Sequence, residues 1–163
     1  MSRFISDKGL MGTLEQVGLS VKDRTAAIKE QTSELVMNAL GFLGVPYRRG
    51  GNSVETGFDC SGFVRAMYQQ SVGLVLPRQA NEQAAATQKV DRKDLQPGDL
   101  VFFNTMRRAF SHVGIYVGNG KFIHSPKPGA DVRVEDMGMG YWQSRFDGVR
   151  RVLAPAAGSP PAP

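Results

Sequence analysis

Apolar residues recur at helical spacing between residues 23 and 43. They lie three, four or seven positions apart, at Ile28, Leu35, Val36, Ala39, Leu40 and Leu43. This spacing puts apolar side chains on one face of a helix, and it is followed by Gly44 and Pro46, two residue types that end helices. We therefore predict an amphipathic helix over residues 23–43.

A second helix is predicted to begin close to Cys60. A loop rich in glycine and arginine comes first, at residues 46–57 (PYRRGGNSVETG), and apolar residues at helical spacing follow, at Phe63, Val64, Met67 and Tyr68. This pattern places Cys60 at a helix N-terminus. Residues 79–88 (QANEQAAATQ) are good helix formers and predict a further helix.

The pattern becomes that of strands after residue 95. Residues 99–103 (DLVFF) form a short, almost wholly apolar run, and residues 112–124 (HVGIYVGNGKFIH) read as two strands around a Gly-Asn-Gly turn. Residues 149–153 (VRRVL) are compatible with another strand. Helices followed by strands indicate an α+β fold, in which N-terminal helices pack on an antiparallel β-sheet.

The two ends of the chain differ from its middle. With 163 residues the chain can form one domain, which we place at residues 33–153. Residues 1–32 are predicted to be a partly helical N-terminal extension, and residues 154–163, rich in Pro and Ala, a disordered tail. No run approaches the roughly 18 apolar residues of a membrane span, and residues 1–20 lack the pattern of an export signal.

Composition narrows the possible partners. The net charge is +5, and the basic pairs at residues 48–49, 92–93, 107–108 and 150–151 are scattered rather than interleaved with aromatic residues. This distribution does not favour a nucleic-acid partner, although it allows an anionic polymer. A solvated basic surface is the alternative interpretation.

Cys60 is the single cysteine of the chain, so neither an internal disulfide nor a multi-cysteine metal site is possible. A helix N-terminus favours the thiolate and lowers the pKa of the thiol. The neighbours Asp59, Ser61 and Gly62 are small or polar, which would let a substrate backbone approach. The local sequence fits a reactive nucleophile and an inert buried thiol equally well.

The two histidines of the chain, His112 and His124, flank the predicted hairpin. A two-residue turn would set Ile115 opposite His124 and point the two imidazoles to opposite faces. A three-residue loop at residues 118–120, with Gly120 at positive φ, would instead set Gly114 opposite His124. We predict the three-residue loop. The histidines then share a face, roughly 7 Å apart as diagonal neighbours.

In that register His112 can take the thiol proton while His124 orients it, as in cysteine hydrolases. The alternative is a pair of ordinary surface or core histidines. A mixed zinc site is not favoured, because its three ligands would be spread from residue 60 to residue 124 without the usual short spacings. We therefore predict neither a metal nor a cofactor.

Four motifs resemble the NlpC family of cell-wall cysteine endopeptidases, which have a reduced papain-like fold. They are FDCSGFV (58–64), LPRQANEQ (76–83), LQPGDLVFF (95–103) and SHVGIYVGNGKFIHSP (111–126). PYRRGG (46–51) is similar to the tyrosine loop of that family. The resemblance covers about residues 33–153, with the motifs in the right order and no large gap.

The resemblance implies that Cys60 is the nucleophile, His112 the general base and His124 the orienting residue. It also implies that the hydroxyl of Tyr47 and the backbone N–H of Cys60 face the developing oxyanion.

The resemblance further places Asp59, Arg78 and Ser111 among residues that line the substrate subsites. Asp59 is suited to a substrate ammonium group and Arg78 to a substrate carboxylate. Asp59 as a helix cap, Arg78 as a surface cation and Ser111 as a strand-entry residue remain alternatives.

The resemblance implies that the substrate is peptidoglycan or muropeptides. The bond expected to be cut follows γ-D-glutamate and precedes a diamino acid, commonly meso-diaminopimelate. The cell envelope, periplasmic or secreted, is then the expected location. An acyltransferase with the same thioester chemistry, a secreted antibacterial toxin and an inactive wall-binding module remain alternatives. Intact wall or released stem peptide as substrate, and the oligomeric state, stay open.

Overall fold

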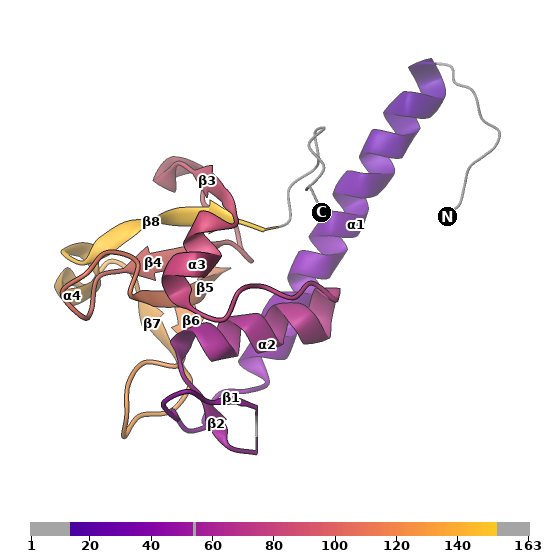
Figure 1. Ribbon diagram of the computed structural model, residues 1–163. Coiled ribbons are helices and arrows are strands. Elements are labelled where there is room, and N and C mark those ends of the chain that lie inside the picture. Colours follow the sequence, from indigo (N-terminus) through magenta and orange to yellow (C-terminus); the bar gives the residue numbers. More distant parts are fainter. Residues whose placement is uncertain (1–13, 54, 153–163) are drawn as a thin grey trace. The chain divides into compact units, whose positions relative to one another are not determined.

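The three longest helices precede the strands of the main sheet along the chain, as the computed structural model shows for residues 14–53 and 55–152 (Figure 1). Residues 31–152 form one compact unit, and all elements lie within it except the first part of helix α1 (Leu14–Leu40). Within the described residues, no helix is long and apolar enough to cross a membrane. The predicted tail, residues 154–163, lies outside the described residues.

Helix α1 confirms the first predicted helix but ends earlier, at Leu40. Leu35 and Ala39 are fully buried, as their spacing predicted. The chain turns at residues 41–44, where Gly44 has a φ of +92°. Leu43, which we had placed in the helix, therefore lies after it and is 49% exposed. Helix α1 runs through residue 32 without a break. The domain boundary that we placed after this residue stays a prediction.

Helix α2 (Cys60–Val72) begins at Cys60, as predicted. The side chain of Asp59 caps its start, and Gly73, in the left-handed region, ends it. The apolar residues that predicted this helix are all buried: Phe63, Val64, Met67 and Tyr68. The helix packs on the main sheet, mainly at the strands formed by residues 112–118 and 121–124, and this packing brings its N-terminus to the sheet.

Helix α3 (Ala80–Ala85) is shorter than the predicted segment 79–88. A reciprocal pair of hydrogen bonds between Gln79 and Glu82 starts it. The last residues of the predicted segment leave the helix, and strand β3 (Gln88–Val90) begins at the last of them and pairs with residues 149–151. Sheet pairing thus overrides the helix propensity of the polar residues there.

The main sheet has six strands in the order β3-β8-β4-β5-β6-β7, and every neighbouring pair is antiparallel. The strands not yet bounded are β4 (Leu100–Phe103), β5 (His112–Gly118), β6 (Lys121–His124), β7 (Arg133–Asp136) and β8 (Phe146–Arg151). The remaining elements are β1 (Asn52–Ser53), β2 (Gly57–Phe58), the short 3-10 helix η1 (Arg92–Asp94) and α4 (Gly140–Gln143). This arrangement confirms the α+β class.

The β5–β6 hairpin has the predicted register but a different turn. Ile115 pairs with Ile123, so the same register sets Gly114 opposite His124. The turn itself is the two-residue type, with Asn119 and Gly120 both at positive φ (55° and 75°). The extra residue lies in a bulge before it, between Tyr116 and Gly118. The predicted three-residue loop was therefore wrong, while the predicted register is confirmed.

One side of the sheet carries an aromatic cluster. Its buried members are Val101, Phe103, Phe122, Met137, Trp142 and Val149. Leu100 and Phe102 alternate with two of these residues along β4 and are also fully buried, so both faces of β4 are covered. The aromatic cluster packs against both histidines and holds them away from water.

Candidate active site

The thiol of Cys60 lies where the start of α2 meets the start of β5. Asp59 fixes this helix start, since its Oδ1 accepts a hydrogen bond of 2.8 Å from the backbone N–H of Gly62. The Cys60 Sγ lies 4.0 Å from the carbonyl oxygen of Ser111 and receives a backbone hydrogen bond from Val113. The thiol thus contacts the strand on both sides of His112.

Burial raises the pKa of the Cys60 thiol to about 11. The backbone N–H groups of Val113 and Ser61 lower this pKa, but by less. The backbone N–H at the helix start thus lowers the pKa as expected, but desolvation of the thiolate has the larger effect, so the net shift is opposite to the expected one. Burial likewise lowers the pKa of His112 well below its usual 6.5. Burial therefore favours the uncharged form of both groups.

The two histidines share a face of the hairpin and touch. His112 Nε2 lies 2.7 Å from His124 Nδ1, and the residues are only 3% and 0% exposed. The predicted common face is therefore confirmed. Gly114 makes this approach possible, because a Cβ at that position would lie 3.1 Å from the Cβ of His124 and 2.7 Å from the ring of Phe122.

Glu135 on strand β7 extends the pair into a chain of three. Its Oε2 lies 3.0 Å from His124 Nε2. A carboxylate only accepts hydrogen bonds, so His124 Nε2 is the donor and His124 Nδ1 the acceptor. His112 must then donate through Nε2, which leaves its Nδ1 as the basic nitrogen. The order of hydrogen bonds therefore sets the tautomer of His112 that can accept a proton.

Two further groups hold the Glu135 carboxylate in place. Arg133 Nε donates to Oε2 at 2.7 Å, and Trp142 Nε1 donates to Oε1 at 3.0 Å. Together with His124, which has the largest effect, these bonds lower the pKa of Glu135 to about 2. The Trp142 ring also stacks on His112, with centroids 5.6 Å apart. Glu135 and Trp142 thus act on the histidines from one side of the sheet.

Glu135, Arg133 and Trp142 were not predicted from the sequence. Residues 132–136 (VRVED) alternate in the manner of a strand, but most of the segment is polar. Extending the hairpin register to a third strand would have set Arg133 opposite His124, with Glu135 on the same face. The alternation of residues 132–136 was therefore the one feature of the sequence from which Glu135 could have been predicted.

Tyr47 lies in the segment between α1 and β1, beside the start of α2. Its backbone pairs with Phe58, and its N–H donates to the carbonyl of Ala130 at 2.9 Å. Burial raises the pKa of Tyr47, and the charges of Cys60 and Asp59 raise it further. The hydroxyl is therefore in the electrostatic neighbourhood of the thiol. Its contact with an oxyanion stays a prediction.

Asp59 and Arg78, expected to hold opposite charges of a substrate, bind each other. Arg78 donates to both carboxylate oxygens of Asp59, at 3.0 and 2.9 Å, and to the Ser61 hydroxyl at 3.0 Å. Asp59 Oδ2 also accepts from the Gly50 N–H at 3.1 Å. Each charge neutralises the other, and Asp59 serves as the helix cap. Contact of either residue with substrate stays a prediction.

Ser111 uses its side chain to organise the loop after β4. Its buried Oγ accepts hydrogen bonds from the N–H groups of Thr105 and Met106, at 3.0 and 3.2 Å. Its carbonyl oxygen is the one that faces Cys60. The structure thus shows Ser111 tying the loop to the entry of β5, and its contact with substrate stays a prediction.

Known proteins share both the sequence and the fold of this region. Murein DD-endopeptidase MepH of Escherichia coli is 42% identical over 140 residues, which cover 83% of this chain and 52% of the relative. Gamma-DL-glutamyl hydrolase of Bacillus subtilis is 39% identical over 137 residues, covering 82% and 33%. The chain thus spans about half, or less, of the length of these relatives.

A solved structure of an NlpC/P60 family protein from Bacillus cereus matches with a TM-score of 0.71 and 34% identity. The match covers 76% of this chain and 40% of that one, and it supports the predicted papain-like α+β fold. The model of the NlpC/P60 family matches residues 44–151, a range that contains Cys60, both histidines and Glu135. The chain therefore belongs to the NlpC/P60 family.

Proposed function

We propose that this protein is a cysteine peptidase that hydrolyses an amide bond in a peptidoglycan stem peptide. The observation that carries this proposal is the chain of hydrogen bonds from Glu135 through His124 to His112, beside a thiol at a helix start. It supplies a nucleophile, a base and groups that orient the base. The names of the two relatives, a murein endopeptidase and a glutamyl hydrolase, support the substrate class.

In the first half of the reaction, Cys60 Sγ attacks the carbonyl carbon while its proton passes to His112 Nδ1. The pair is uncharged at rest, so this transfer accompanies the attack. The C–N bond then breaks as His112 returns the proton to the leaving nitrogen, which leaves a thioester on Cys60. In the second half, His112 takes a proton from water, which attacks the thioester. The C–S bond then breaks, the acid leaves, and His112 returns the proton to Cys60 Sγ.

The negative oxygen that forms in both halves needs donors. The backbone N–H of Cys60 is at the first position of α2, where it has no partner within the helix. The Tyr47 hydroxyl is the second donor in this proposal. Two donors aimed at the developing charge stabilise the transition state more than the substrate.

The bond that we propose is the one between γ-D-glutamate and the diamino acid. The name of the B. subtilis relative, a gamma-DL-glutamyl hydrolase, supports it. A second candidate is the cross-link between two stem peptides, because MepH is named a murein DD-endopeptidase. For either bond the substrate lies in the cell envelope, and we propose a periplasmic or secreted location.

The test is to incubate the purified protein with monomeric and cross-linked muropeptides and to identify the products by mass. Cleavage after γ-D-glutamate supports the first bond, and conversion of dimers to monomers supports the second. Products joined to an added amine would indicate an acyltransferase. Unchanged muropeptides, with the Cys60→Ala variant as background, would contradict hydrolysis and favour a binding module.

A further inference from the structure

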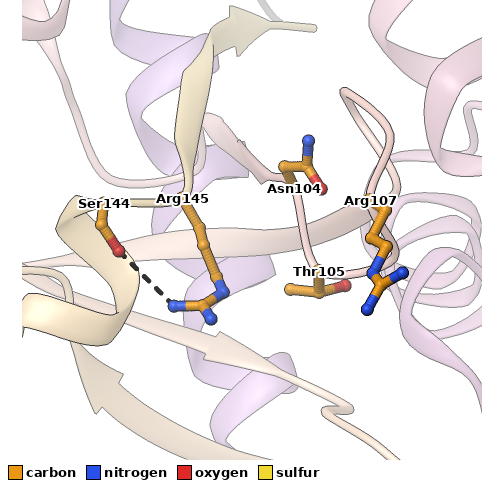
Figure 2. A pocket seen from close by; sticks show the side chains of 5 residues that line it. All are labelled: Asn104, Thr105, Arg107, Ser144 and Arg145. Atoms are coloured by element: carbon orange, nitrogen blue, oxygen red, sulfur yellow. Dashed lines mark hydrogen bonds between the residues drawn. The ribbon is translucent and has the colours of Figure 1, made fainter.

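A polar pocket of about 470 Å³ lies beyond the end of strand β4, which pairs with the strand that carries His112 (Figure 2). It forms where the loop after β4 meets the turn between α4 and β8, and a hydrogen bond of 2.8 Å from Asn104 N–H to the Arg145 carbonyl joins the two segments. The lining residues are Asn104, Thr105, Arg107, Ser144 and Arg145. They offer two guanidinium groups, two hydroxyls and an amide, and no carboxylate.

Both walls of this pocket continue into the surroundings of His112. Asn104 follows Phe103, whose strand position pairs with His112. Arg145 lies three residues after Trp142, whose ring stacks on His112, and donates a backbone hydrogen bond to the Trp142 carbonyl. Both walls of the pocket are thus connected, through Phe103 and Trp142, to residues that contact His112.

Arg145 is held in position without a carboxylate. One of its terminal nitrogens, Nη1, donates to the Tyr141 carbonyl at 3.0 Å and approaches the Ser144 hydroxyl at 3.4 Å. Its guanidinium stacks on the Tyr141 ring, 3.8 Å from the ring centre. These contacts occupy one edge of the guanidinium, and Nη2 remains for a ligand. A guanidinium that is already oriented loses less entropy when it binds an anion.

Arg107 is on the opposite wall, on a loop fixed at both ends. Ser111 Oγ accepts from the N–H groups at the start of this loop, and Asp147 accepts from the Phe110 N–H at 2.7 Å at its end. Arg107 itself has a φ of 60°, unusual for a residue with a side chain. Figure 2 shows Arg145 and Arg107 on two separate segments, with Thr105 between them in this view. Among the ion pairs of the described residues, neither arginine has a carboxylate partner.

The position of His112 relative to the thiol determines which part of the substrate lies near this pocket. His112 must reach the leaving nitrogen to protonate it, so the amine product lies on the His112 side. With the proposed bond, that product begins with the diamino acid. The side chain of diaminopimelate ends in a second carboxylate, whereas that of lysine ends in an ammonium group.

We propose that the Arg107–Arg145 pocket binds the side-chain carboxylate of diaminopimelate and so selects it over lysine. This inference rests on the proposed function and names the residues that determine which leaving group the enzyme accepts. The two guanidinium groups attract a carboxylate. The side chains of diaminopimelate and lysine both carry an ammonium group when free, so the added carboxylate of diaminopimelate is what distinguishes the two side chains. In a cross-linked stem peptide the neighbouring amine is acylated, so the carboxylate alone is charged and the same preference holds.

The test compares kcat/KM for L-Ala-γ-D-Glu-meso-diaminopimelate and L-Ala-γ-D-Glu-L-Lys. Wild type should prefer the diaminopimelate peptide, and Arg145→Gln should lower the ratio of the two values roughly ten- to hundred-fold, the scale of one charge-assisted hydrogen bond. Arg107→Gln should lower the same ratio. Because Arg107 is exposed, this second variant tests the pocket even if Arg145→Gln fails to fold. Arg108→Gln, an exposed neighbour outside the pocket lining, is the matched control.

Binding separates failure of the pocket from failure of the proposed function. Both peptides are titrated calorimetrically into the Cys60→Ala protein, with and without Arg145→Gln. If wild type cuts neither peptide but binding of the diaminopimelate peptide depends on Arg145, the pocket stands and hydrolysis fails. If wild type cuts both peptides at a ratio that neither arginine variant changes, the pocket is refuted and hydrolysis stands.

Discussion

Replacing Glu135 by Gln tests whether the hydrogen-bonded chain works as a unit. The carboxylate accepts from three donors, His124 and Arg133 on one oxygen and Trp142 on the other. A glutamine amide has one oxygen, so in either orientation its NH₂ group faces an N–H donor. With the NH₂ group toward His124, the tautomers of both histidines reverse and His112 Nδ1 becomes protonated. No basic nitrogen then remains for the thiol.

The expected magnitude follows from what the carboxylate does during attack. His112 becomes positive as it takes the thiol proton, and Glu135 stabilises that charge through His124. Losing one charge-assisted interaction costs about 1.5–3 kcal/mol, which corresponds to a roughly 10- to 150-fold lower kcat. KM should change little, because Glu135 lies behind His124 and acts on the proton transfer rather than on the substrate.

The assay is steady-state cleavage of a muropeptide, with thermal unfolding measured in parallel to confirm that the variant is folded. Asp136→Asn is the matched control. The exposed carboxylate of Asp136 accepts a hydrogen bond of 2.7 Å from the Gly138 N–H, which an asparagine oxygen can also accept, and lies 4.0 Å from Lys121. This variant should keep the wild-type kcat. A folded Glu135→Gln protein with the kcat of the Asp136→Asn control would refute the tautomer argument.

Four further outcomes are expected. Cys60→Ala should abolish cleavage and leave the melting temperature close to that of wild type, whereas residual turnover would remove Cys60 from the mechanism. His112→Gln should lower kcat roughly 10²- to 10⁴-fold and His124→Gln less, since His112 is the base itself; equal losses would contradict these roles. Because the pKa of Cys60 is about 11, absorbance of the thiolate near 240 nm should appear only well above pH 9; a thiolate signal at neutral pH would contradict this. Unfolding free energy should fall as the pH drops below 6.5, because the unfolded chain then binds protons that His112 and His124 resist, and fall again from 4.5 toward 2 through Glu135; a constant melting temperature from pH 7 to 4 would contradict it.

Local patterns predicted the parts of the site that local geometry determines. The start of α2 at Cys60 was predicted from the apolar residues that follow at helical spacing, and the register of the hairpin was predicted from the loop at residues 118–120 with Gly120 at positive φ. The structure reaches the predicted register in a different way: the extra residue lies in a bulge next to Gly118 and not in the turn. Both solutions shift the strand by one residue, so the sequence alone does not separate them.

The rest of the site depends on pairing between distant segments. Strands β3 and β7 lie at the two edges of the sheet and are mainly polar, so they lack the apolar alternation that reveals a half-buried strand. Glu135 was therefore missed. The ion pair of Asp59 and Arg78 and the desolvation of Cys60 likewise result from tertiary packing, which reversed the expected direction of the thiol pKa.

Trp142 gives this protein a built-in optical probe. It is the only tryptophan in the chain, 5% exposed, and it stacks on His112 and meets His124 edge-on, with centroids 5.1 Å apart. A protonated imidazole quenches indole fluorescence by accepting an electron from the excited ring. Emission from the unlabelled protein therefore follows the charge of the histidine pair, and rapid mixing with substrate can time the proton transfer during a single turnover.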